Sequence, residues 1–278
     1  MKSSRGLLAG SLFLGLVALP YALSAQTPAP NVIRQNMPIV ALQNGHFQES
    51  LSIAEAKIQG DFGIGAMSSL DGEIINVGGQ IYQFKSDGTV RVPANQERLS
   101  FSAMTLFRPS SSPIPLPAGT TFACLGPMLD PILPTLNTFY AIRIQGTFSS
   151  ATARTFPRQQ EPFPPLCRVT PAVFPFTNVS GTMVGYRSPG SPRYLENVAL
   201  ANYHLHFLNS PRNGGGHVLD FTVTNATVEI VPLRTLLLDF PNDRAFNTMD
   251  LSEPITCSPP APEPPTPVCP PLPKKAGE

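Results

Sequence analysis

Two segments of alternating polar and apolar residues decide the fold of this chain: Asn202-Tyr-His-Leu-His-Phe-Leu208 and His217-Val-Leu-Asp-Phe-Thr-Val223. A period of two is typical of a β-strand, because successive side chains point to opposite faces. The residues between them, Asn209 to Gly216, contain Pro and three consecutive Gly, as a turn does. The sequence therefore predicts an antiparallel hairpin.

This hairpin carries three of the four histidines of the chain. His204 and His206 lie on one face of the first strand, and the return strand can bring His217 beside them. Three imidazoles with an open fourth position are typical of a catalytic zinc site, and nitrogen ligands favour zinc over magnesium or calcium. We therefore predict a Zn²⁺ site; the alternative is a surface hairpin or core histidines bonded to backbone. His46, after Asn44-Gly45, is interpreted as a turn residue rather than a ligand.

The composition excludes several classes of protein. The 278 residues include 33 Pro and 21 Gly, with 42% hydrophobic and 13% charged residues. Because 19 basic groups nearly cancel 18 acidic ones, the chain has no basic field to hold nucleic acid or anionic lipid. The same balance, with this hydrophobic content, excludes a wholly disordered chain and allows a sizeable core.

Most of the remaining chain is patterned like strands. Residues 139–148 alternate, and residues 74–84, interrupted by Gly78-Gly79, predict hairpins. Helical periodicity is confined to residues 50–57 and 128–138, where prolines limit the second segment. We therefore predict an α+β, mainly β fold, with mixed or antiparallel sheets in two halves and a few short helices.

The N-terminus is patterned like a secretory signal. Lys2 and Arg5 precede an apolar run from Leu7 to Leu19, and small residues follow at Ala22, Ser24 and Ala25. The run is shorter than the roughly 20 residues that cross a membrane, so we expect residues 1–25 to be removed, with an uncleaved anchor as the alternative. The mature protein is then predicted to be secreted or periplasmic, without a membrane segment.

We divide the mature chain into an N-terminal β-rich half (26–150), a zinc-binding β half (151–252) and a Pro-rich tail (253–278). Ten prolines lie between positions 254 and 273, where apolar periodicity stops. Four cysteines allow three disulfide connectivities: Cys257 with Cys269 would close the tail on itself, whereas Cys124 with Cys167 would join two Pro-rich loops. The spacing does not choose among them.

Two charged residues are candidates for chemistry beside the metal. Glu73 ends Leu70-Asp-Gly-Glu73 just before a strand and could face a pocket, although an ordinary surface carboxylate is the alternative. Arg154, in Ala151-Thr-Ala-Arg-Thr-Phe156, could clamp a substrate carboxylate through two parallel hydrogen bonds, or be an ordinary strand or loop arginine.

Six motifs together resemble the alpha-acetolactate decarboxylase family, in the same order along the chain, and the resemblance runs from about residue 37 to about residue 251. The motifs are Gly60-Asp-Phe-Gly-Ile-Gly65, Leu70-Asp-Gly-Glu73, Tyr140-Ala-Ile-Arg-Ile-Gln-Gly-Thr-Phe148, Thr152-Ala-Arg-Thr155, Asn178-Val-Ser-Gly-Thr-Met-Val-Gly185, and Tyr203-His-Leu-His-Phe207 with Gly215-Gly-His-Val-Leu-Asp-Phe221. Each is short, but six in register are specific.

The resemblance implies that the three histidines hold zinc, with Glu73 and Arg154 beside it. It also implies a second glutamate from the C-terminal segment, which ungapped extension places at Glu263, with Glu253 as the alternative. Ala66 stands where the family usually carries Thr, which removes a hydroxyl from near the site.

The implied activity is zinc-dependent decarboxylation of 2-acetolactate to acetoin and CO₂ through a metal-stabilised enediolate. The implied partner is this small-molecule substrate, with no nucleic acid, and a homodimer is the family expectation. Two alternatives come from other classes: another secreted zinc lyase or hydratase with a three-His site, and a non-catalytic secreted metal-binding protein.

Overall fold

The computed structural model describes residues 30–189, 202–252 and 267–273. The predicted signal segment and both candidate tail glutamates, Glu253 and Glu263, lie outside the described residues. Among the residues that are described, no helix is both long enough and apolar enough to cross a membrane.

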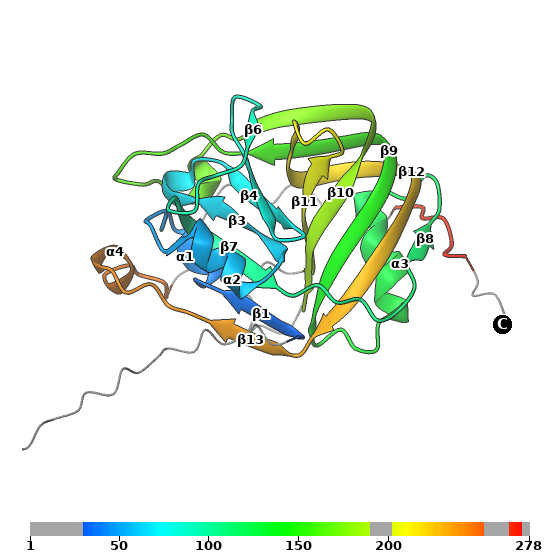
Figure 1. Cartoon of the computed structure of the whole chain (residues 1–278), viewed down its shortest axis with the longest axis horizontal. Helices are drawn as coiled ribbons and strands as arrows, with labels where there is room; N and C mark the ends of the chain where they lie inside the picture. Colours follow the sequence, from blue (N-terminus) through cyan, green and yellow to red (C-terminus); the bar gives the residue numbers. More distant parts are fainter. Residues whose placement is uncertain (1–29, 190–201, 253–266, 274–278) are drawn as a thin grey trace, which may run out of the picture.

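The first sheet is built mainly from the N-terminal part of the chain (Figure 1). Its strands are β1 (Val32–Gln35), β2 (Leu51–Ser52), β3 (Phe62–Met67), β4 (Glu73–Val77), β5 (Gln80–Phe84), β6 (Val90–Arg91), β7 (Arg98–Thr105) and β13 (Thr235–Leu238). They follow the order β13-β1-β7-β3-β4-β5-β6, with β2 paired to β7. The sheet is mixed, because β13 runs parallel to β1 while the other pairs are antiparallel.

The second sheet contains three long strands that curve over the first sheet (Figure 1). Its strands are β8 (Ile114–Leu116), β9 (Phe139–Thr155), β10 (Ala172–Ser188), β11 (Asn202–Asn209) and β12 (Gly215–Leu233). The order is β11-β10-β9-β12-β8, and β11 also pairs with β12. This extra pairing closes β9, β10, β11 and β12 into a ring. The predicted mainly β fold of the α+β class is confirmed.

Three short helices lie between strands, α1 (Ile39–Gln43), α2 (Ile53–Gln59) and α3 (Leu125–Leu129), and α4 (Arg244–Asn247) follows β13. The helix expected at residues 50–57 begins later, because the Ser52 side chain caps the backbone N–H of Glu55 and the Glu55 side chain accepts from the backbone of Ser52. The helix expected at residues 128–138 is wrong: α3 ends at residue 129, and a single 3₁₀ turn containing Pro131 follows.

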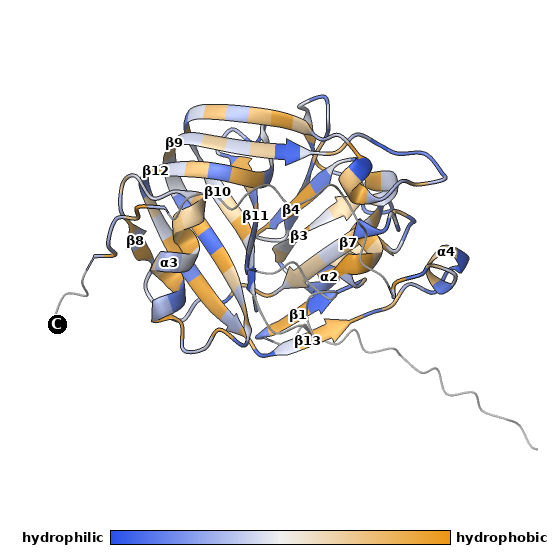
Figure 2. Cartoon of the chain, turned by 180° about the vertical axis from the view of Figure 1, so that it is seen from behind, coloured by the Kyte–Doolittle hydropathy of each residue, from blue (hydrophilic) through white to orange (hydrophobic). Residues whose placement is uncertain are grey.

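The expected boundary at residue 150 falls inside β9 and is wrong as a division between sheets. The alternating pattern of this strand continues through residue 155, and β13 returns the chain to the first sheet after β12. Figure 2 shows apolar and polar residues alternating along β9 and β12. One apolar cluster joins the facing sides of the two sheets, and a second lies within the second sheet against α3.

A disulfide between Cys124 and Cys269 attaches the end of the tail to the start of α3. It matches neither of the two pairings named above, and it joins residues 145 positions apart. Leu272 packs beside it against the apolar cluster of the second sheet. The residues that bring these cysteines together are distant in sequence, which is why their spacing could not identify the pair.

We predict that the double variant Cys124→Ser/Cys269→Ser is less stable than the native protein, by about 2–4 kcal/mol, because the disulfide restricts a long loop in the unfolded chain. Denaturant unfolding measures the loss. Arg108→Ala instead removes the ion pair that this exposed side chain forms with Asp61 and should cost far less, since exposed ion pairs contribute little. An unchanged unfolding midpoint in the serine variant would contradict the prediction.

Candidate metal centre

The predicted hairpin is formed by β11 and β12, and it brings the three histidines together. His206 and His217 are directly paired across the two strands. In the turn, the Asn209 side chain accepts hydrogen bonds from the backbone of Asn213 and Gly214 at 3.0 and 3.1 Å. Gly216 then has a φ of +138°, and a Cβ there would lie 2.4 Å from a backbone oxygen of β9. The turn therefore requires glycine at the position before His217.

The histidine nitrogens are spaced as a metal ion requires. One nitrogen from each of His204, His206 and His217 lies within 4.8 Å of the others, and Nε2 of His204 is 3.0 Å from Nδ1 of His217. Nitrogens bound tetrahedrally to zinc at about 2.0–2.1 Å lie roughly 3.3 Å apart. The cluster therefore needs only small side-chain movements to hold a metal ion.

A backbone contact orients the most buried of these ligands. Nδ1 of His206 lies 2.7 Å from the carbonyl oxygen of Ile74 in β4. Because a carbonyl only accepts, Nδ1 must carry the proton, and the lone pair of Nε2 is left to bind a metal. This arrangement fixes both the tautomer and the direction of the ring.

Burial keeps all three histidines neutral. It lowers the pKa of His206 to about 3, with the charge of Arg154 adding to the effect and the bond to Ile74 opposing it. Burial also lowers the pKa values of His204 and His217 well below their usual range, reinforced by the neighbouring histidines and Arg154. Neutral imidazoles are the form that binds a metal ion.

Glu73 is the first residue of β4 and lies against the histidines. Its Oε2 is 3.3 Å from Nε2 of His206 and 3.8 Å from Nδ1 of His217, and the side chain is 8% exposed. Burial raises the pKa of Glu73 to about 8, opposed by the charge of Arg154 and by a hydrogen bond from the His217 backbone. This carboxyl group can therefore hold or release a proton near neutral pH.

The turn before Glu73 has an unusual backbone. Ser69 and Leu70 both have positive φ values, 57° and 52°, in a region that residues other than glycine seldom adopt. Gly72 has a φ of +85°, and a Cβ there would lie 2.0 Å from the carbonyl oxygen of Phe84. This tight path delivers Glu73 into the site and buries Leu70 in its wall.

Arg154 enters the same pocket from β9, where it is paired with His217 of β12. Its guanidinium carbon lies 4.7 Å from the centre of the Phe156 ring, over the ring face. Nε of Arg154 and Oε2 of Glu73 are both buried without a hydrogen-bond partner among the residues that the structure describes. Buried polar atoms of this kind are rare, so the pair fits a site that holds a further group.

The pocket has a volume of about 160 Å³ and is enclosed mainly by apolar side chains. The pocket is lined by the residues that the sequence predicts for the site: His204, His206, His217, Glu73 and Arg154. Ala66 also lines it. Glu263 lies outside the described residues. The sequence did not predict the walls from α1 and the 3₁₀ turn at 166–168, because these elements are too short to show a period. They contribute Ile39, Leu42, Gln43 and Leu166.

His46 lies away from this cluster. It directly follows the turn at residues 44–45, and its backbone N–H closes that turn by donating to the Ala41 carbonyl at 2.9 Å. As predicted, it is not part of the histidine cluster. Its ring is fully buried, with Nε2 2.9 Å from the Asp243 carboxylate, and the same carboxylate caps α4. The carboxylate that pairs with His46 belongs to a residue 197 positions distant, so no local pattern could reveal this contact.

The fold and the site define a class: a two-sheet, mainly β protein whose histidine group can bind a metal ion beside a carboxylate and a guanidinium in a small pocket. Comparison with known proteins narrows this class. The family model described as alpha-acetolactate decarboxylase matches residues 33–253. The chain belongs to the alpha-acetolactate decarboxylase family.

The sequences of individual relatives align with this chain over most of their length. The alpha-acetolactate decarboxylase of Bacillus subtilis strain 168 is 35% identical, over 80% of this chain and 86% of the relative. The alpha-acetolactate decarboxylase of Methylococcus capsulatus is 36% identical, over 78% of this chain and 83% of the relative.

Solved structures of similar proteins share the fold. The crystal structure of the Bacillus subtilis strain 168 protein superposes with a TM-score of 0.76, covering 80% of this chain and 94% of that one, at 35% identity. A Staphylococcus aureus protein of unknown function, described as similar to alpha-acetolactate decarboxylase, has a TM-score of 0.74 at 27% identity, covering 79% of this chain and 94% of that one.

We predict that His204→Ala and His217→Ala each lose the bound metal, because two remaining imidazoles bind far more weakly than three. Metal analysis of the purified variants should show occupancy below about a tenth of the native value. His46→Gln is the matched control, since it changes the remaining histidine of the chain and should keep its metal. Full occupancy in either alanine variant would contradict a three-histidine site.

The raised pKa of Glu73 predicts a pH-dependent stability in metal-free protein. Because the pKa rises from 4.5 to about 8 on folding, the stabilisation from its bound proton is complete below about pH 4.5 and is lost as the pH rises through 8. Glu73→Gln removes this titration. After chelation, the variant should therefore be more stable than the native protein at pH 9, by on the order of a few kcal/mol.

Denaturant unfolding of both chelated proteins between pH 5.5 and pH 9 tests this expectation. The difference in unfolding free energy should shrink steadily as the pH falls. A difference that stays constant over this range would show that Glu73 does not take up a proton on folding.

Proposed function

We propose that this protein is a zinc-dependent enzyme that decarboxylates 2-acetolactate to acetoin and CO₂. The observation that carries the proposal is the meeting of the three histidines, Glu73 and Arg154 in one small pocket of a chain from this family. The reaction breaks one carbon–carbon bond and returns one proton to carbon, so it needs a place for negative charge and a proton donor.

Zinc is the metal we propose, because three neutral imidazole nitrogens suit it better than magnesium or calcium. His204, His206 and His217 would hold it. When bound, the ion supplies Lewis-acid stabilisation of the negative charge that develops on the substrate oxygen as CO₂ leaves.

Arg154 would orient the substrate. Acetolactate carries a carboxylate and a hydroxyl group, and a guanidinium binds either through directed hydrogen bonds. The ring of Phe156 lies under the guanidinium, which restricts its plane, and Nε has no hydrogen-bond partner within the described part of the chain. Arg154 therefore has both the charge and an uncommitted donor for this task.

Glu73 would supply the proton. When the bond to CO₂ breaks, the electron pair stays on the substrate and delocalises toward its ketone, giving an enediolate. The Glu73 carboxyl group is buried beside the histidine cluster, with Oε2 3.3 Å from Nε2 of His206, and is placed to carry a proton to the carbon that has lost CO₂. The apolar pocket walls limit the access of water as a competing donor. Glu263 is proposed to assist from the tail.

Export and self-association also belong to the proposal. The charged and apolar pattern of residues 1–25 supports secretion or a periplasmic location. The Cys124–Cys269 disulfide supports it independently, because such bonds persist in oxidising compartments. A homodimer remains the expectation from the family resemblance.

Acetoin formation from acetolactate by the purified mature protein tests the function. We expect activity that a chelator abolishes and zinc restores. Glu73→Gln should lower kcat by roughly 100-fold or more with zinc retained, because it removes the proton donor. Arg154→Ala should lower kcat/KM by a similar factor, because the substrate is no longer oriented.

Glu229→Gln is the control for Glu73→Gln, since Glu229 bonds to Arg143 at 2.6 Å on the second sheet and does not line the pocket. It should keep native kcat. Stoichiometric zinc without acetoin formation would reject the proposed activity and favour a metal-binding protein.

A further inference from the structure

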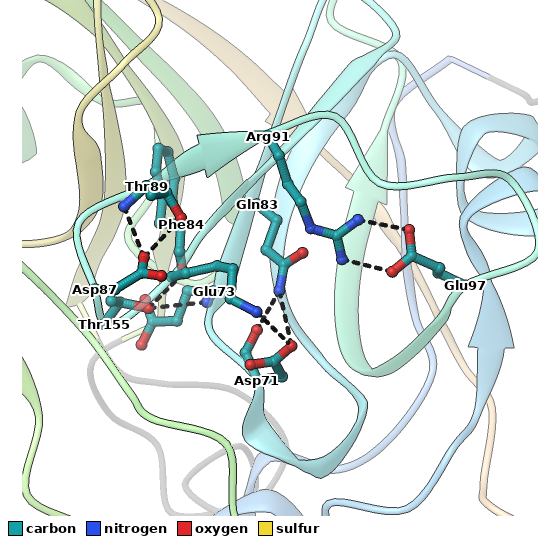
Figure 3. Close-up of polar contacts among 10 residues, drawn as sticks. Asp71, Glu73, Gln83, Phe84, Asp87, Thr89, Arg91, Glu97 and Thr155 are labelled. Atoms are coloured by element: carbon teal, nitrogen blue, oxygen red, sulfur yellow. Dashed lines mark hydrogen bonds and ion pairs between the residues drawn. The ribbon is translucent and has the colours of Figure 1, made fainter.

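Two side chains of the second sheet, Thr155 and His206, form hydrogen bonds to the backbone of the first two residues of β4. The backbone N–H of Glu73 donates to Oγ1 of Thr155 at 3.0 Å, and the Thr155 hydroxyl donates to the carbonyl oxygen of Phe84 at 2.9 Å (Figure 3). His206 holds the next residue through the carbonyl of Ile74. Thr155 is fully buried, so both of its hydrogen bonds are shielded from water.

Thr155 joins elements that carry different parts of the site. It directly follows Arg154 at the end of β9, where Arg154 is paired with His217. Its two hydrogen bonds reach Glu73 and Phe84, which face each other across β4 and β5. The end of β9 thus carries the guanidinium of Arg154 and, through Thr155, also fixes the backbone of Glu73.

The Glu73 side chain depends on this support. Its Oε2 has no hydrogen-bond partner in the described protein, and the carboxyl group also accepts a hydrogen bond from the backbone of His217, so its position depends on how the start of β4 lies against β12. The preceding turn contains two consecutive residues with positive φ, Ser69 and Leu70, a conformation that relaxes unless its surroundings hold it. A displacement of about 1 Å in a reacting group can lower a rate about 100-fold.

We propose that Thr155 is a positioning residue: its hydroxyl fixes the start of β4 so that the Glu73 carboxyl stays at the histidine cluster and in register with Arg154. The inference rests on the proposed function of Glu73. It assigns Thr155 no contact with substrate or metal.

Thr155→Val tests the proposal, because it keeps the shape of the side chain and removes both hydrogen bonds. We expect kcat for acetoin formation to fall roughly 10- to 100-fold, with KM and bound zinc within about twofold of native. Thr155→Ser restores the hydroxyl and should recover kcat to within about threefold. If Thr155→Val does not fold, Thr155→Cys replaces it, and the weak thiol donor should give an intermediate kcat.

Thr105→Val is the matched control. Thr105 is also fully buried, and its hydroxyl donates to the Val32 carbonyl at 2.7 Å in the first sheet, outside the pocket. This variant should lose a similar amount of stability to Thr155→Val and keep native kcat. A purely structural role for Thr155 would lower the unfolding midpoint alone.

Crystal structures of the variants give a readout that is independent of activity. We expect the distance from Oε2 of Glu73 to Nε2 of His206 to increase in Thr155→Val relative to native and to stay unchanged in Thr155→Ser and Thr105→Val. Native kcat in Thr155→Val, a serine variant as impaired as the valine variant, or an unmoved Glu73 would each overturn the proposal. Absence of acetoin formation by the native protein would instead overturn the proposed function, and the structures would still test Thr155.

Discussion

The hydrogen bond from His206 to the backbone of Ile74 is the interaction on which the site depends. It ties β11 of the second sheet to β4 of the first, fixes which nitrogen of His206 faces the cluster, and places the neighbouring Glu73 beside it. The bond needs a buried carbonyl at the start of β4, which the unusual turn before Glu73 provides. The hydrogen bond between His206 and Ile74 therefore both joins the two sheets and orients a histidine of the pocket.

Burial is the second constraint, and it opposes charge on the three histidines and on Glu73. The histidines lose their affinity for protons, whereas Glu73 gains it. The Nε of Arg154 is buried without a partner among the described residues. A buried polar group without a partner costs about 1–3 kcal/mol, so a ligand that accepts a hydrogen bond from this donor would gain affinity from it.

The sequence was informative wherever the signal was local. Alternation at His204, His206 and the return strand at His217 predicted both the hairpin and the histidine cluster, and the β-rich class followed from similar patterns. Other features depend on residues distant in sequence: the return of β13 to β1, the contact of His46 with Asp243, and the Cys124–Cys269 pair. Sequence context made Glu73 and Arg154 candidates with ordinary alternatives, and the motif match favoured a role at the site, because a lone charge carries no period. Neither approach found Thr155 as a link between the sheets.

The closed ring of β9, β10, β11 and β12 also bears on how the site moves. At residues 206–208, β11 is paired on both sides, with β10 and with β12. A strand with neighbours on both edges does not fray as an edge strand does, so its amide protons exchange with solvent only when several strands separate together. His206 and His217 thus belong to a cooperative unit, and their spacing persists through the small openings that occur elsewhere on the molecule.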